Sequence, residues 1–132
     1  MNGLTGWFPL LGRILIGHIF LLSGLNKIFH YSQTAAYMAS KNVPMIEALL
    51  VLSIIVEIAG ALMIIFGWRA KLAAAVFFLW LIPVTFMMHN FWAVPAAEKM
   101  GQLINFQKNL VIMGTMLYIV AFGPGRYSLR RD

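Results

Sequence analysis

The chain contains no cysteine, and this absence excludes several classes of protein. Without thiols there is no disulfide framework, no Cys-x-x-Cys redox motif, no thiolate metal site and no catalytic cysteine. Glycine-rich phosphate loops, metal-ligand spacings and Ser/His/Asp arrangements are absent as well. The sequence therefore predicts no metal site and no self-contained catalytic machinery. It leaves open whether the protein is a subunit of an enzyme.

Charged residues are scarce, at 11% of the 132 residues, whereas hydrophobic residues reach 61%. An average soluble domain is about 45–50% apolar and about 25% charged. A soluble fold of this size could not bury so much apolar surface, so lipid must cover much of it. The net charge of +6 comes from basic residues that flank apolar segments. They are typical of topology signals and phospholipid anchors, not of contacts to nucleic acid.

Four apolar stretches are long enough to cross a bilayer, which takes about 20 helical residues. Within a single domain of residues 1–132, they cover residues 7–29, 46–67, 70–94 and 103–122. We expect an all-α polytopic membrane protein, an antiparallel bundle of four transmembrane helices. Residues 32–41 predict a short interfacial helix between the first two spans, with Tyr37 and Met38 facing the lipid boundary. Residues 95–101 predict a surface loop.

The basic residues also predict an orientation. With four spans, both termini and the 67–71 turn lie on the same side of the membrane. That side holds slightly more basic residues than the other: Arg13, Arg69, Lys71, Arg126, Arg130 and Arg131, against Lys27, Lys41, Lys99 and Lys108. Because cytoplasmic loops carry an excess of Lys and Arg, we predict that both termini are cytoplasmic.

Glu57 lies near the middle of the second apolar stretch. An ionisable group at that depth costs roughly 2.5–3.5 kcal/mol on insertion scales, so it needs a partner, a cavity or a proton. The first span carries a one-sided stripe at helical spacing: Arg13, Gly17, Phe20, Gly24 and Lys27. We predict a buried Arg13–Glu57 ion pair between the two helices. Two roles stay open for it, a fixed bridge that sets register and a site that responds to protons or lipid headgroups.

A polar cluster is expected at the opposite end of the bundle from the termini. Lys27 ends the first span, His89 and Asn90 end the third, and Lys108 and Asn109 open the fourth. In an up-down-up-down bundle these residues lie at one membrane face. Histidine can donate or accept a proton near neutral pH. We predict that the five residues bind a polar head such as a quinone carbonyl, a phosphate or a carboxylate; alternatively, they are ordinary interfacial residues.

Several short motifs follow one another along nearly the full chain. They are the stripe from Arg13 to Lys27, Tyr37-Met38, Pro44, Glu57 with Gly60, Phe66-Gly67 with Ala70, His89-Asn90-Phe91, Asn105-Phe106-Gln107-Lys108-Asn109, Gly123-Pro124-Gly125 and Ser128. In this order and spacing the sequence resembles the DoxX family of small bacterial inner-membrane proteins. One departure is Arg130, which follows Leu129 where family members often have aspartate.

The resemblance implies a four-helix, multi-pass protein of the bacterial inner membrane. Through the related DoxD-type subunits of quinone oxidoreductases, it also implies a link to quinone-dependent sulfur oxidation, or to complexes that handle oxidative or thiol stress. It strengthens the case for Arg13, Lys27, Glu57, His89 and the Lys108-Asn109 pair as a matched set.

Three functions are compatible with these observations. The first is a membrane subunit of a redox-linked system; having no intrinsic cofactor, it would need a bound quinone or a partner protein that carries electrons. The second is a non-enzymatic scaffold that binds other proteins, and the third is a small proton-linked carrier. The expected partners are the lipid bilayer and a membrane redox protein, with no nucleic acid. The substrate and the oligomeric state stay open.

Overall fold

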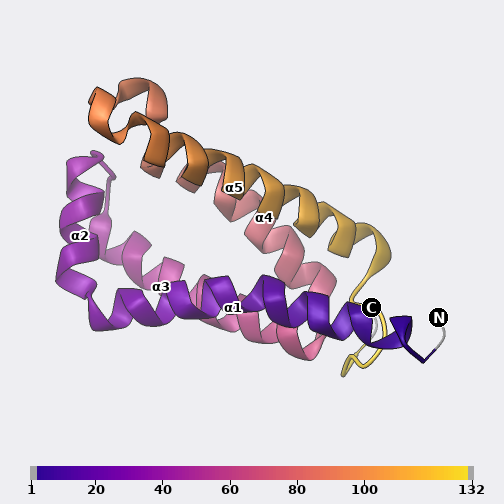
Figure 1. Cartoon of the computed structure of the whole chain (residues 1–132). Coiled ribbons are helices and arrows are strands. Elements are labelled where there is room, and N and C mark those ends of the chain that lie inside the picture. Colours follow the sequence, from indigo (N-terminus) through magenta and orange to yellow (C-terminus); the bar gives the residue numbers. More distant parts are fainter. Residues whose placement is uncertain (1–2, 131–132) are drawn as a thin grey trace.

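The computed structural model describes residues 3–130, and its elements are helices. In chain order they are η1 (Thr5–Trp7), α1 (Phe8–Phe29), α2 (Tyr31–Ser40), α3 (Ile46–Phe66), α4 (Ala70–Met88), η2 (Phe91–Ala93) and α5 (Ala96–Phe122). Arg131, one of the basic residues that predict the orientation, lies outside the described residues. Figure 1 shows α1 beside α3 and α4 beside α5, with α2 at one end of the molecule.

Within residues 3–130, four segments are long and apolar enough to cross a membrane: Thr5–Phe29, Ile46–Phe66, Ala70–Ala93 and Ala96–Phe122. The predicted all-α fold with four spans and a short helix after the first is confirmed. The outward side chains are apolar and open, for example Val111 at 70% and Phe122 at 78% exposure. Such a surface is compatible with lipid and not with water.

The predicted third span, residues 70–94, agrees with the segment Ala70–Ala93, whereas the predicted loop at residues 95–101 is wrong. Helix α4 ends at Met88, and His89 caps it by donating its backbone N–H to the Thr85 carbonyl. Residues 95–101 are not a surface loop, because α5 already begins at Ala96 behind the cap residue Pro95. A first turn with two alanines and Glu98 favours this early start, since an acidic side chain is stabilised at a helix N-terminus.

Small residues hold the helices tightly together at the end that carries both chain termini. Gly60 faces the ring of Phe77, and a Cβ atom on Gly60 would lie 2.6 Å from Phe77 Cζ. Phe77 is fully buried and stacks on Phe20, with 4.2 Å between ring centroids. Around these rings the core is built largely of alanines: Ala61, Ala70, Ala73 and Ala74. Met116 and Ile119 of α5 belong to the same core, which therefore joins α1, α3, α4 and α5.

Glycines also allow α1 and α3 to pack closely along their length. A Cβ atom on Gly24 would lie 2.6 Å from Ile58 Cγ1, and one on Gly17 would overlap the side chain of Ile65. Close approach at small residues is the common way for membrane helices to associate. Figure 1 shows that this α1–α3 pair and the α4–α5 pair diverge toward α2. This divergence leaves room for a cavity between the two pairs.

Candidate functional site

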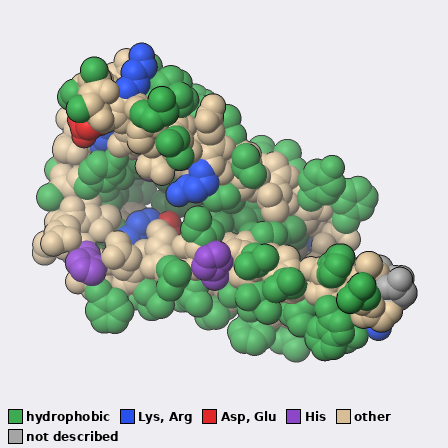
Figure 2. All heavy atoms as spheres, viewed as in Figure 1, with side chains coloured by type: hydrophobic (Ala, Val, Ile, Leu, Met, Phe, Trp, Pro, Cys, Tyr) green, Lys and Arg blue, Asp and Glu red, His purple; other side chains and the backbone are tan. Residues whose placement is uncertain are grey.

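A cavity of about 450 Å³ lies between the two helix pairs, at the end closed by α2. Most of its lining is apolar, and a few charged and polar side chains project into it. Figure 2 shows this face of the molecule hollowed between α1 and α5, with acidic and basic side chains inside the hollow. Cavities that bind small molecules have volumes of about 300–1,000 Å³ and a similar mixture of apolar walls and few polar groups.

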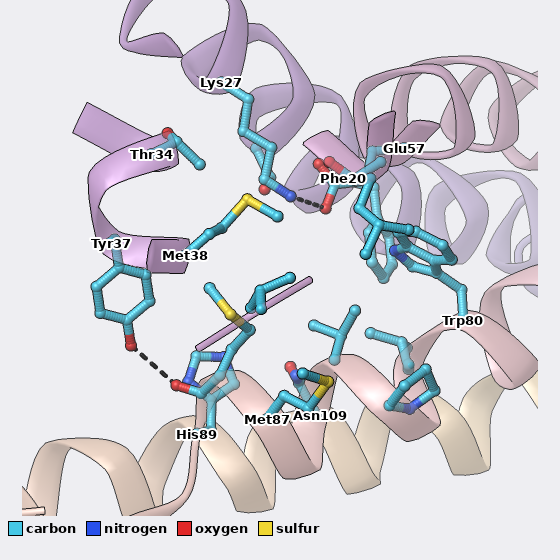
Figure 3. Close-up of a pocket in the computed structure, with 18 of the residues that line it drawn as sticks. Phe20, Lys27, Thr34, Tyr37, Met38, Glu57, Trp80, Met87, His89 and Asn109 are labelled. Carbon is cyan, nitrogen blue, oxygen red and sulfur yellow. Dashed lines mark hydrogen bonds and ion pairs between the residues drawn. The ribbon is translucent and has the colours of Figure 1, made fainter. Parts of the chain in front are cut away.

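Lys27 and Glu57 form an ion pair on the α1–α3 wall of the cavity. The distance from Lys27 Nζ to Glu57 Oε1 is 2.6 Å, and the two side chains are 22% and 10% exposed. The second carboxylate oxygen, Oε2, is buried and has no hydrogen-bond partner among residues 3–130. Figure 3 shows the pair across the cavity from His89 and Asn109. A lysine thus supplies the counter-charge for the buried acid and satisfies one of its two oxygens.

The predicted Arg13–Glu57 pair is therefore wrong. Arg13 is buried, at 3% exposure, and its guanidinium donates hydrogen bonds to backbone carbonyls instead. The acceptors are Ile65 at 2.9 Å, Arg126 at 2.8 Å and Tyr127 at 2.7 Å. Arg13 thus binds the free carbonyls at the C-terminal end of α3 and fastens the C-terminal segment to it.

The direction in which helical side chains lean explains this difference. Side chains on a helix lean toward its N-terminus. Lys27 therefore leans toward Gly24, where a Cβ atom would lie 3.4 Å from Glu57 Cβ. Arg13 leans in the same direction on the same helix, which takes its side chain away from Glu57. In the antiparallel neighbour, Glu57 leans toward the end of α3 that faces Lys27. Ile65, which Arg13 contacts, lies about 12 Å from Glu57 along the axis of α3.

The opposite wall brings together most of the predicted polar cluster. Lys108 and Asn109 from α5 and His89 at the end of α4 line the same cavity as Lys27. Asn109 is 7% exposed and donates from Nδ2 to the Thr85 hydroxyl at 3.2 Å. The antiparallel order of the helices thus brings these four residues to one cavity, although Lys108 and Asn109 lie near the middle of α5 and not at the opening of the span, as was predicted. Their role in binding a ligand stays a prediction.

Asn90, the fifth residue of the predicted set, is not part of the lining described for this cavity. Its Oδ1 accepts a hydrogen bond from Lys41 at 2.7 Å, which ties the end of α2 to the end of α4. In this structure Asn90 therefore holds two helix ends together.

Helix α2 closes the cavity through a second network. The Tyr37 hydroxyl donates to the Met88 carbonyl at 2.8 Å and accepts from Gln102 Nε2 at 2.9 Å. Gln102 Oε1 lies 2.9 Å from His89 Nδ1. Met38, on the next position of α2, is 8% exposed and lines the cavity. The expectation that Met38 faces the lipid boundary is therefore wrong, since its side chain is buried against the cavity. Tyr37 also lines the cavity but is 38% exposed, so for Tyr37 the expectation stays a prediction.

Other lining residues were not predicted as site residues. Trp80 projects into the cavity from α4 beside Phe20, and Met38 and Met87 line other parts of the same cavity (Figure 3). Trp80 is the one tryptophan of the chain placed well inside a predicted span, whereas the other three lie near predicted span ends, as aromatic belts do. Its position inside a predicted span was the feature of the sequence that could have indicated Trp80 as a site residue. The polar lining residue Ser53 lies one helical turn before Glu57, on the same face of α3.

Comparison with known proteins gives a consistent result. A family model described as DoxX matches residues 8–90. Inner membrane protein YphA of Escherichia coli (strain K12) is 30% identical over 122 residues, covering 92% of this chain and 87% of that protein. Inner membrane protein YqjF of the same strain is 34% identical over 122 residues, covering 92% of this chain and 88% of that protein.

Part of a longer yeast protein is also similar to this chain. The Surfeit locus protein 4 homolog of Schizosaccharomyces pombe is 30% identical over 125 residues, which cover 93% of this chain but 36% of that protein. No solved structure matches the chain significantly.

Proposed function

The chain belongs to the DoxX family, as its motifs predicted, and we propose that it is an inner-membrane subunit of a redox-linked system whose cavity binds a quinone head. The two bacterial relatives are named inner membrane proteins, which supports this location. The observation that carries the proposal is the cavity itself, an apolar space between membrane-spanning helices with hydrogen-bond donors on both of its walls.

The available donors match a head group that accepts hydrogen bonds. Lys27 carries three N–H donors, and one of them is engaged by Glu57. Lys108 lies on the facing wall and forms no salt bridge within residues 3–130. A quinone ring presents carbonyl oxygens, which only accept. Two ammonium groups against a single carboxylate leave the cavity with an excess of positive charge, which also favours the partly negative carbonyl oxygens of such a head.

The apolar lining suits the ring of such a head. Trp80, Phe20 and Met87 offer flat or polarisable surfaces inside the cavity. Aromatic faces pack on other rings in offset or edge arrangements, and methionine sulfur makes favourable contacts with rings. The walls would exclude water from the head, and the lysines would orient it.

The chain's own residues bind and orient in this proposal, and they do not carry electrons. The sequence has no cysteine, and no group of three His, Cys, Asp or Glu side chains gathers within residues 3–130 as metal ligands would. A bound quinone would supply two-electron chemistry coupled to protons. The other half of the reaction then requires a partner protein with its own redox group.

Quenching of Trp80 fluorescence tests the proposal directly. We expect decylubiquinone to quench the protein in nanodiscs with a saturable curve, and the quenching to be lost in Trp80→Phe. Lys108→Met should weaken binding about tenfold or more, because a hydrogen bond to a charged group contributes about 1.5–3 kcal/mol. Lys71→Met, at the far end of the bundle, is the matched control and should bind as the wild type does.

Two results would contradict the proposal. One is quenching that rises linearly without saturation in the wild type. The other is equal binding by the Lys108 and Lys71 variants. A third result would favour the scaffold function, which needs no polar cavity. In that case no quinone binds, and cells that carry Lys108→Met behave as cells that carry the wild-type protein.

A further inference from the structure

A second, smaller hollow of about 190 Å³ lies on the outer surface between α1 and α5. Leu15 and Ile16 line it from α1, and Val111 and Thr115 line it from α5. Helices α1 and α5 pack mainly on other helices and make little contact with each other. We call this hollow the α1–α5 groove.

The groove adjoins the cavity. Ile19, Lys108 and Ile112 line both spaces, so the two meet between α1 and α5. Figure 2 looks onto this face, where the surface is hollowed between the two helices. The groove therefore reaches Lys108, a polar group of the cavity, and its other lining residues are apolar except for His18 and Thr115.

The position of the groove along the helices determines what it faces. Ile16 lies near the middle of the span Thr5–Phe29, and Val111 and Thr115 lie in the second half of the span Ala96–Phe122. Leu15 is 58% exposed and Val111 is 70% exposed. At this depth a bilayer presents acyl chains and not water. A molecule that passes through the groove comes from the lipid phase.

We propose that the α1–α5 groove is a lateral portal that holds the apolar tail of the ligand while its head lies in the cavity. This inference rests on the proposed function and specifies it, because the ligand must then carry a long prenyl or acyl tail. Lipid is as apolar as the groove, so the tail gains little affinity there. The groove lets the head reach Lys27 and Lys108 while the tail stays outside the cavity.

Filling the groove separates a tailed ligand from a tail-less one. In Thr115→Phe the larger side chain fills the groove, so the tail of a bound quinone cannot extend through it to the lipid. We expect decylubiquinone to bind this variant about tenfold more weakly, equivalent to about 1.4 kcal/mol. The tail-less parent benzoquinone should bind Thr115→Phe and the wild type equally. Leu117→Phe, on an exposed face of α5 outside the groove, is the control for partitioning into the nanodisc and should leave both affinities unchanged.

A second measurement avoids dependence on the folding of that variant. A quinone with a photoreactive diazirine at the end of a short tail, bound to the wild-type protein, should crosslink to α1 and α5 near Leu15 and Val111. Crosslinking confined to α2, or equal weakening of the tailed and tail-less quinones by Thr115→Phe, would overturn the portal while the cavity still binds. If neither quinone binds the wild type, the proposed function fails first, and the portal fails with it.

Discussion

Removing the charge of Lys27 should destabilise the protein through Glu57. Lys27→Met keeps most of the apolar stem and deletes the ammonium that lies 2.6 Å from Glu57 Oε1. Removing one partner of a fully buried pair costs about 3–5 kcal/mol, because the other charge is left without compensation. Here the Lys27 side chain is still 22% exposed, so water already screens part of the interaction. We therefore expect a loss of about 2–3 kcal/mol in the free energy of unfolding.

The second substitution of the cycle should restore most of that loss. Glu57→Leu combined with Lys27→Met removes both charges and also removes the unpartnered Oε2 atom. Replacing a buried pair by apolar residues of similar volume is often neutral or stabilising. We expect a coupling energy of about 2 kcal/mol between the two positions, within the range found for directly contacting residues. Titration with SDS in mixed micelles, followed by circular dichroism, gives the four unfolding free energies.

A parallel cycle with Arg13→Met provides the control. Arg13 contacts carbonyls about two helical turns from Glu57, so its effect should add to that of Glu57→Leu within about 0.5 kcal/mol. The reasoning is refuted if Lys27 and Glu57 are additive, or if Arg13 and Glu57 are the coupled pair.

Two further substitutions, each with a control variant, test the packing of the core and the docking of α2 over the cavity. Gly60→Ala places a Cβ atom 2.6 Å from Phe77 Cζ. We expect it to lower the free energy of unfolding by about 1–3 kcal/mol in the same SDS titration. The control Gly12→Ala, whose Cβ atom meets no atom within 4 Å, should not lower it. Tyr37→Phe removes the hydroxyl that binds Met88 and Gln102. This substitution should weaken the docking of α2 by about 1–2 kcal/mol, which would be measured as faster hydrogen exchange in Tyr31–Ser40. The control Tyr118→Phe, at an exposed position, should leave the exchange of α2 unchanged. Unchanged exchange in Tyr37→Phe would contradict the role of Tyr37 in holding α2 over the cavity.

Much of the architecture followed from local properties of the chain. An apolar stretch of bilayer length must form a helix in lipid, because no water is available for its backbone. With four such stretches, the alternation of direction brings the end of α1, the end of α4 and the middle of α5 to one cavity. This is why four of the five predicted ligand residues line one cavity.

The tertiary structure decided how those groups are used. The partner of Glu57 depends on the register of α1 against α3 and on the lean of each side chain. The carbonyl that Arg13 binds lies about two turns from Glu57 along α3. Backbone carbonyls, which bind Arg13, have no signature in a sequence. The cavity exists because small residues close the bundle at one end and the helix pairs diverge at the other. Spacing along a chain specifies the face and depth of a residue on its own helix, whereas contact between helices depends on how their surfaces fit.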